Sequence, residues 1–443
     1  MRRKIHGLIL PLLIAFIIVS APSFAQEQSV SRLDLPNGMV LLTQEEHEND
    51  IVSIEVFINA GLLHETDQNA GIINLIQNLI LKGAGKYNSQ QIAEMLELNG
   101  IMMSASSSPD FAEISCTTTS KNFVHAVQIL GEVLSNPRFE QAEIDKEKKN
   151  IIEQIEGEQS AFTAIYNIFL QNFYRYHPYR QPILGMAKAI KNLTRDNILD
   201  FYRTYYVPNR MVIAVSGNIN KNEVKETVKK VFKNFNPSNP RPIEITWEPP
   251  NEEREIYLSS SGNLSWLFIG YQAPEVISED YYAMKLIYSY LGEGLSSRIW
   301  TELREKRGMA YDLGAFYPSL EGPSHFIAYI VTTPDKIMES KRRILYEISQ
   351  IKSSGIPDFQ LEQVKQKVIG GYLLERETDR GKAESLGSAE IQGEGYMADE
   401  NFEKKIKEVT SEQIKAVANK YLKNYIMVIV LPGQQNPGQL MEE

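Results

Sequence analysis

The pattern of apolar and polar positions predicts strands and helices that follow one another along the chain. Short runs rich in β-branched residues indicate strands, and apolar residues spaced three and four positions apart indicate helices. In the first half, strands are expected within Leu33–Thr43, Ile51–Ala60, Ile101–Ser107, Phe111–Thr119 and Met211–Ser216. Helices are expected at Asn88–Leu98, Asn122–Leu134, Glu140–Glu156, Ala161–Tyr174 and Thr194–Tyr206.

The second half of the chain repeats the pattern of the first. Phe139-Glu140-Gln141 opens a charged helix, and Phe359-Gln360-Leu361 opens a similar one 220 positions later. The strand that begins at Met211 is matched by one that begins at Met427, 216 positions later. Two similar offsets between strings of like pattern indicate an internal duplication.

A segment rich in proline and polar residues, 236–253, separates the two repeats and is expected to be a linker. The sequence therefore predicts an α+β protein built from two homologous α/β halves, residues 26–235 and 254–443. Each half is expected to be a mixed sheet packed with helices.

One predicted helix, Gly71–Ala84, is apolar on most sides but carries a polar stripe. The stripe consists of Asn74, Gln77 and Asn78, which share one face because they stand three and four positions apart. The simplest interpretation is a solvated stripe on an amphipathic helix.

The charge balance disfavours a nucleic-acid partner. Among 443 residues, 46 are Lys or Arg and 56 are Asp or Glu, giving a net charge of −10. Cys116 is the only cysteine, so no internal disulfide can form.

The first 25 residues have the features of a secretory signal. Arg2, Arg3 and Lys4 precede an apolar segment, and Ser23-Phe24-Ala25 provides a small-x-small cleavage site. An uncleaved anchor is the alternative, but the apolar run is short and contains a proline. We expect an exported protein, periplasmic or extracellular, without stable membrane insertion after cleavage.

The Gly71–Ala84 helix resembles the signature helix of the pitrilysin/insulinase family of zinc peptidases. Asn74 and Asn78 stand where that family has its two zinc-binding His, and Gln77 stands where it has the Glu that acts as general base. Gln154 stands where the family has its third ligand, a Glu on a later helix. Glu65 and Glu147 also match family Glu positions. The resemblance implies two duplicated halves that form a clamshell around a chamber.

These four replacements imply that zinc catalysis has been lost from this chain. A catalytic zinc ion needs three good donors and an open position for water. Amides are poor ligands for zinc beside imidazole and carboxylate, and they cannot take a proton from water. We therefore expect no zinc or other cofactor in this chain.

A second stretch, Gly294–Tyr311, resembles the motif of the family's C-terminal half. Arg304 and Tyr311 fall on the Arg and Tyr that reach toward bound substrate in active members. The alternative is that Arg304 is a helix-surface charge and Tyr311 a core aromatic. Arg298 is expected to be structural.

The function implied by the resemblance is that of a non-catalytic subunit of a heterodimeric zinc metallopeptidase that acts on peptides. A homologous catalytic chain would supply the zinc site, and this chain would supply Arg304, Tyr311 and half of the chamber. The alternative is a binding or structural protein of the same fold with no peptidase role. The sequence identifies neither the peptide substrate nor the partner.

Overall fold

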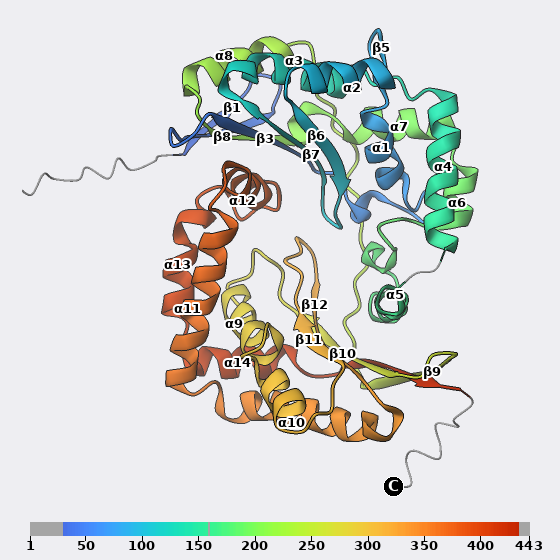
Figure 1. The fold of residues 1–443 in the computed structure, drawn as a ribbon, viewed down its shortest axis with the longest axis vertical. Helices are drawn as coiled ribbons and strands as arrows, with labels where there is room; N and C mark the ends of the chain where they lie inside the picture. Colours follow the sequence, from blue (N-terminus) through green and yellow to red (C-terminus); the bar gives the residue numbers. More distant parts are fainter. Residues whose placement is uncertain (1–29, 158–159, 434–443) are drawn as a thin grey trace, which may run out of the picture.

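Two mixed β-sheets, one in each half of the chain, organise the fold (Figure 1). The computed structural model describes residues 30–157 and 160–433, so the signal predicted for residues 1–25 lies outside the described residues. The first sheet contains β1 (Ser31–Asp34), β2 (Val40–Glu45), β3 (Ile51–Ile58), β6 (Met102–Ser107), β7 (Ala112–Thr119) and β8 (Met211–Gly217). The second contains β9 (Arg254–Ser260), β10 (Ser265–Ala273), β11 (Asp312–Phe316), β12 (Ser324–Thr332) and β13 (Ile426–Pro432).

The strand order confirms the predicted duplication. The first sheet runs β1-β2-β8-β3-β7-β6, and the second, read from its other edge, runs β9-β13-β10-β12-β11. In both halves an early strand pairs in parallel with the last strand, β2 with β8 and β9 with β13. The remaining pairs are antiparallel. A two-stranded ribbon of β4 (Gly83–Ala84) and β5 (Tyr87–Asn88) lies apart from both sheets.

Helices cover the sheets in each half, and several begin at the residues that the sequence indicated. Asn88 caps α2 by accepting a hydrogen bond from the Gln91 N–H, and Thr194 caps α7 in the same way through Asn197. The first half has α1 (Ile72–Ile80), α2 (Ser89–Leu98), α3 (Phe123–Ser135), α4 (Gln141–Glu156), α5 (Ala161–Phe173), α6 (Ala187–Asn192), α7 (Arg195–Tyr205) and α8 (Lys221–Phe232). The second has α9 (Tyr281–Gly292), α10 (Ile337–Ser354), α11 (Asp358–Glu375), α12 (Asp379–Ile391), α13 (Ala398–Glu408) and α14 (Ser411–Tyr421).

Residues 235–253, between the halves, form no helix or strand. None of the helices in the described parts of the chain is both long and apolar enough to cross a membrane.

One helix from each half packs on the sheet of the other half (Figure 1). Helix α12 lies across β3 and β8, where Gly387 approaches Phe57 so closely that a Cβ would lie 2.2 Å from the ring. Helix α5 lies across β10 and β13, where a Cβ on Gly270 would lie 2.1 Å from the Phe169 ring. The two helices hold equivalent places in the repeat, because α5 follows the charged helix α4 and α12 follows its counterpart α11. The halves are thus joined by a reciprocal exchange of helices.

The contact beneath α12 includes a carboxyl group that is buried in the first sheet. Glu55 on β3 is fully buried, and its Oε1 accepts hydrogen bonds of 2.9 Å from the Ser53 and Ser115 hydroxyls. Arg380 of α12 lies 3.8 Å from the same oxygen, and Oε2 has no partner. Burial raises the pKa of Glu55 to about 8, because a charge is costly in this environment.

We expect the free energy of unfolding to fall as pH rises from about 5 to 8, partly because of Glu55. The unfolded carboxyl, with its ordinary pKa near 4.5, releases its proton in this range while the folded one keeps it. Glu55→Gln should therefore flatten the pH dependence, by about 2–4 kcal/mol over this range. Urea unfolding of both proteins at pH 5 and pH 8 measures the difference. An unchanged slope would show that Glu55 is ionised in the fold.

Candidate functional site

Helix α1, which carries the polar stripe, begins at a tightly packed turn. Gly71 precedes the helix with φ of +94°, and a Cβ there would lie 2.8 Å from the Cα of Gly185. Glycine is therefore required at this position for both the backbone conformation and the close approach. The packing fixes the N-terminus of α1 against the loop that ends at Gly185.

Glu65 caps this helix from the preceding loop. Its Oε2 accepts from the Gly71 N–H at 2.8 Å and its Oε1 from the Ile73 N–H at 3.1 Å. The side chain is 5% exposed, and burial raises its pKa to about 7 against the effect of both hydrogen bonds. The structure thus gives Glu65, which matched a family position, the role of holding α1.

Glu65→Ala should lower the free energy of unfolding by about 2–4 kcal/mol, because two buried N–H groups would lose their acceptor. Glu65→Gln, which keeps one amide oxygen, should cost clearly less. Urea denaturation at about pH 8, where the Glu65 carboxyl is ionised, gives both values. If both substitutions lower the free energy of unfolding equally, the negative charge of Glu65 stabilises α1 more than its hydrogen bonds do.

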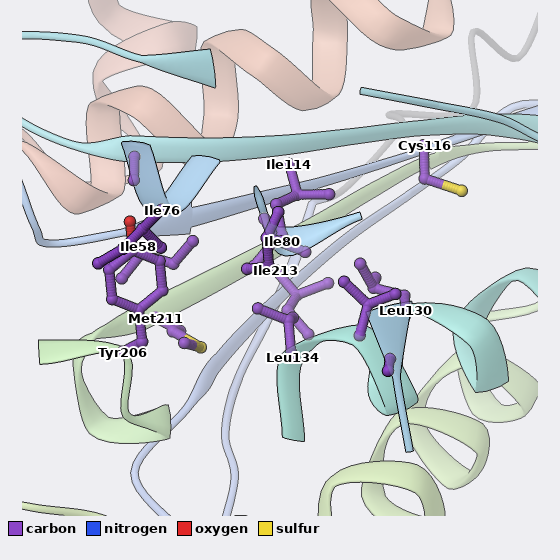
Figure 2. Packing of buried hydrophobic residues seen from close by; sticks show 14 of the residues in the cluster. Ile58, Ile76, Ile80, Ile114, Cys116, Leu130, Leu134, Tyr206, Met211 and Ile213 are labelled. Atoms are coloured by element: carbon purple, nitrogen blue, oxygen red, sulfur yellow. The ribbon is translucent and has the colours of Figure 1, made fainter. Parts of the chain in front are cut away.

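The polar stripe on α1 is not a solvated face, so the simplest interpretation is wrong. Asn78 is exposed and Asn74 is half-buried, but Gln77 is only 3% exposed. Helical periodicity places three residues on one side, whereas burial depends on the neighbouring elements. Near Gln77 the neighbours include Tyr206, whose ring lies among Ile58, Ile76 and Met211 (Figure 2).

Several polar atoms of this stripe have no well-formed hydrogen bond in the described structure. Both amide atoms of Gln77 and the Asn74 Nδ2 lack a hydrogen bond of good geometry, although the Tyr206 hydroxyl lies close enough to the Gln77 side chain to interact with it. The Asn78 Nδ2 instead donates to the Asn74 carbonyl at 2.9 Å and to the Asn74 Oδ1 at 3.4 Å. The two asparagines are therefore hydrogen-bonded to each other. Burial of the Gln77 amide between them, without a well-formed hydrogen bond, costs free energy.

Gln154 lies on α4, which packs against α1, so the matched positions stand on adjacent helices. Gln154 itself is exposed near the end of α4. Glu147, on the same helix, is buried and lies 3.9 Å from the Lys82 ammonium. Its other oxygen accepts from the Asn150 amide at 3.3 Å. Both carboxylate oxygens of Glu147 therefore have partners, Lys82 and Asn150.

These residues do not fit a zinc ion. The four matched positions on α1 and α4 carry neutral amides, and the Asn74 oxygen already accepts from Asn78. Nowhere in the described chain do three or more His, Cys, Asp or Glu side chains gather in a way that could hold a metal ion. At the position of the general base, the Gln77 amide cannot take a proton.

Arg304 and Tyr311 lie together in the second half, where a π-helical turn, Trp300–Glu305, leads toward β11. The Arg304 Nη1 donates to the Tyr311 carbonyl oxygen at 2.5 Å, and the guanidinium lies 4.8 Å from the centre of the Trp300 ring. Tyr311 is 61% exposed, so it is not a core aromatic. No hydrogen bond or ion pair in the described residues links this pair to α1 or α4.

Arg298 is structural, as expected. Its Nη2 lies 3.0 Å from a Glu347 carboxylate oxygen and 3.3 Å from a Glu302 oxygen. These ion pairs join the turn after α9 to α10 and support the segment that carries Arg304.

Sequence reasoning missed a cavity where the two halves meet. It has a volume of about 290 Å³ and lies between α5, the loop that ends at Gly185 and the second half. His325, which lies in the buried strand β12, contributes to its wall. A histidine inside an otherwise apolar strand pattern is the one signal in the sequence that points to it.

Comparisons with known proteins agree with this architecture. Residues 40–187 match the family described as insulinase (peptidase family M16), and residues 192–368 match the peptidase M16 inactive domain. The chain is 23% identical over 411 residues to the uncharacterized zinc protease YmxG of Bacillus subtilis, covering 92% of this chain and 100% of that one. It is 24% identical over 419 residues to the uncharacterized zinc protease ML0855 of Mycobacterium leprae, with coverage of 92% and 93%.

Solved structures of similar proteins share the fold. A protease from Helicobacter pylori superposes with a TM-score of 0.86 at 20% identity, covering 91% of this chain and 100% of that one. A peptidase M16 inactive domain from Pseudomonas fluorescens superposes with a TM-score of 0.84 at 21% identity, covering 92% and 100%.

Proposed function

Since this chain belongs to the M16 (insulinase/pitrilysin) family of zinc-protease homologues, we propose that it is a non-catalytic subunit of a two-chain peptidase. Its partner would be a homologous chain with intact zinc ligands. This chain would contribute Arg304, Tyr311 and half of a chamber that encloses a peptide.

The observation that carries the proposal is the contrast between the two motifs. At Asn74, Gln77, Asn78 and Gln154 every group able to bind zinc or accept a proton is replaced by an amide. The framework around them is intact, since Glu65 still caps α1 and α1 still packs against α4. The zinc-binding groups are replaced while the packing of α1 and α4 is kept. This combination favours a role that depends on the fold and not on catalysis within this chain.

The arrangement of Arg304 and Tyr311 supports a contact with substrate. One guanidinium nitrogen holds the Tyr311 backbone, and an arginine has further N–H donors for another acceptor. The Tyr311 side chain stands in solvent, although an aromatic ring gains by burial. A guanidinium N–H and a Tyr hydroxyl can each donate to a peptide carbonyl and stabilise the oxyanion that forms from it.

We further propose that the chain is exported and works outside the cytoplasm. The support is the basic, apolar and small-residue pattern of its first 25 residues. Sequencing the N-terminus of the protein from its native source would show whether cleavage occurs after Ala25.

The test of the proposed function is reconstitution. A tagged copy expressed in its native source should co-purify with a homologue that carries His-x-x-Glu-His. The purified pair should cleave peptides, and neither chain alone should do so. A chain that stays monomeric and recovers no such homologue would favour the alternative, a binding or structural protein of the same fold.

A further inference from the structure

The cavity where the two halves meet has the construction of a ligand site. Its volume of about 290 Å³ is near the roughly 300 Å³ at which small-ligand pockets begin. Helix α5, which forms one wall, lies between the first half and the second sheet (Figure 1). Leu62, Leu170 and Leu320 contribute buried apolar surface, and Thr163 and Ile183 stand exposed at the rim.

The cavity borders the degenerate zinc site. Gly185 lines it and packs directly on Gly71, the residue that precedes α1. Ile155 lines it and follows Gln154 on α4. A chain bound along α1 and α4 would therefore pass beside the cavity.

A fixed set of hydrogen bonds determines what the polar part of the wall can offer. The Tyr174 hydroxyl donates to the Pro323 carbonyl oxygen at 2.8 Å and has only one proton. It must therefore accept from the His325 Nδ1, which lies at 2.8 Å. Burial lowers the pKa of His325 to about 3, so the ring is neutral and its Nε2 carries no proton.

Tyr166 completes the set. Its hydroxyl lies 3.1 Å from the bare His325 Nε2 and donates its proton there. The Tyr166 oxygen keeps lone pairs that can only accept a hydrogen bond. The other polar side chains of the lining are Thr163 and Asn167, together with Tyr179 and Gln181, which already donate to Asp110 and Asp67. The wall is thus mainly apolar, and the Tyr166 oxygen in it is an acceptor that suits a ligand with an apolar body and one donor.

From this geometry we propose that the cavity binds one large side chain of a peptide, with a preference for tryptophan or tyrosine. The choice of a peptide as the source of the side chain rests on the proposed function, whereas the size and the acceptor come from the cavity itself. A free fatty acid fits less well, because no Lys or Arg is among the described residues that line the cavity and could pair with its carboxylate.

The test uses the isolated full chain and neutral capped amino acids as probes. N-acetyl-tryptophanamide and N-acetyl-tyrosinamide should bind more tightly than N-acetyl-phenylalaninamide, by roughly threefold to tenfold for one hydrogen bond. N-acetyl-alaninamide should not bind measurably. Saturation-transfer NMR titrations give the four affinities. Equal affinity for the alanine and tryptophan probes, or binding of decanoate alone, would overturn the proposal.

Two substitutions place the binding in this cavity. Tyr166→Phe should remove the advantage of the tyrosine probe over the phenylalanine probe and leave phenylalanine binding unchanged. Thr163→Trp, which fills the rim, should abolish binding of every probe. Ser353→Trp, on the exposed surface of α10, is the matched control and should bind as the wild type does. Binding that survives Thr163→Trp would contradict the proposal.

This outcome is separable from that of the proposed function. If the pair assembles and cleaves but the probes do not bind, only the cavity inference fails. If the probes bind but no catalytic partner exists, the proposed function fails and the cavity remains a site for an apolar side chain.

Discussion

Arg304→Ala in the reconstituted pair is expected to lower kcat by about a hundredfold or more while assembly stays intact. Removing one donor to a developing oxyanion typically has an effect of this size. The substitution also removes the 2.5 Å hydrogen bond that positions the Tyr311 backbone, so its effect should exceed that of Tyr311→Phe. Arg304→Lys should keep only part of the wild-type kcat, because a lysine ammonium lacks the planar fork of N–H donors of a guanidinium.

The measurement is kcat and KM of the mixed complex, together with a binding assay for the two chains. Lys306→Ala is the control, because Lys306 is a nearby cation that pairs with Glu302 at 2.6 Å and is not one of the two residues proposed to contact substrate. A double-mutant cycle should show that Arg304→Ala and Tyr311→Phe are not additive, since one residue positions the other. If both variants assemble and cleave at the wild-type rate, this chain is only a wall of the chamber.

The second large effect concerns metal binding. The isolated protein is expected to hold no stoichiometric zinc and to cleave no peptide. A variant with Asn74→His, Gln77→Glu, Asn78→His and Gln154→Glu should bind about one zinc per chain, because α1 and α4 already pack together and two imidazoles with one carboxylate form a zinc-ligand set.

Metal analysis after dialysis, with the melting temperature in the presence and absence of zinc, checks this prediction. A triple variant that keeps Gln154 is the control and should bind more weakly, since it lacks the third ligand. One zinc per chain in the wild type, lost on Asn74→Ala or Gln154→Ala, would show that the amides do hold a metal and that the interpretation of the site is wrong.

The sequence predicted the parts of this protein that depend on local pattern. Asn88 and Thr194 cap helices because their side chains bond the backbone three residues ahead, which needs no distant partner. The duplication could be predicted because the second half of the chain repeats the order of elements of the first half. The structure adds that the matched positions on α1 and α4 lie on adjacent helices.

Features set by distant neighbours were not predictable from pattern. The burial of Gln77 depends on elements such as the one that carries Tyr206, more than a hundred residues away in the chain. Glu65 is a loop residue by sequence, and its role as a cap depends on how the chain returns to α1. The cavity is bounded by side chains from both halves, so its only trace in the sequence is His325 within an otherwise apolar strand pattern.

The exchange of α5 and α12 determines how the molecule can come apart. Each half lends the helix that completes the other, which is the arrangement of a domain-swapped dimer whose two subunits have been fused into one chain. A fragment that ends in the linker would keep its own sheet but leave one apolar face bare around Phe57 and Ala214. The halves are therefore not independent modules, and they should unfold in one cooperative transition.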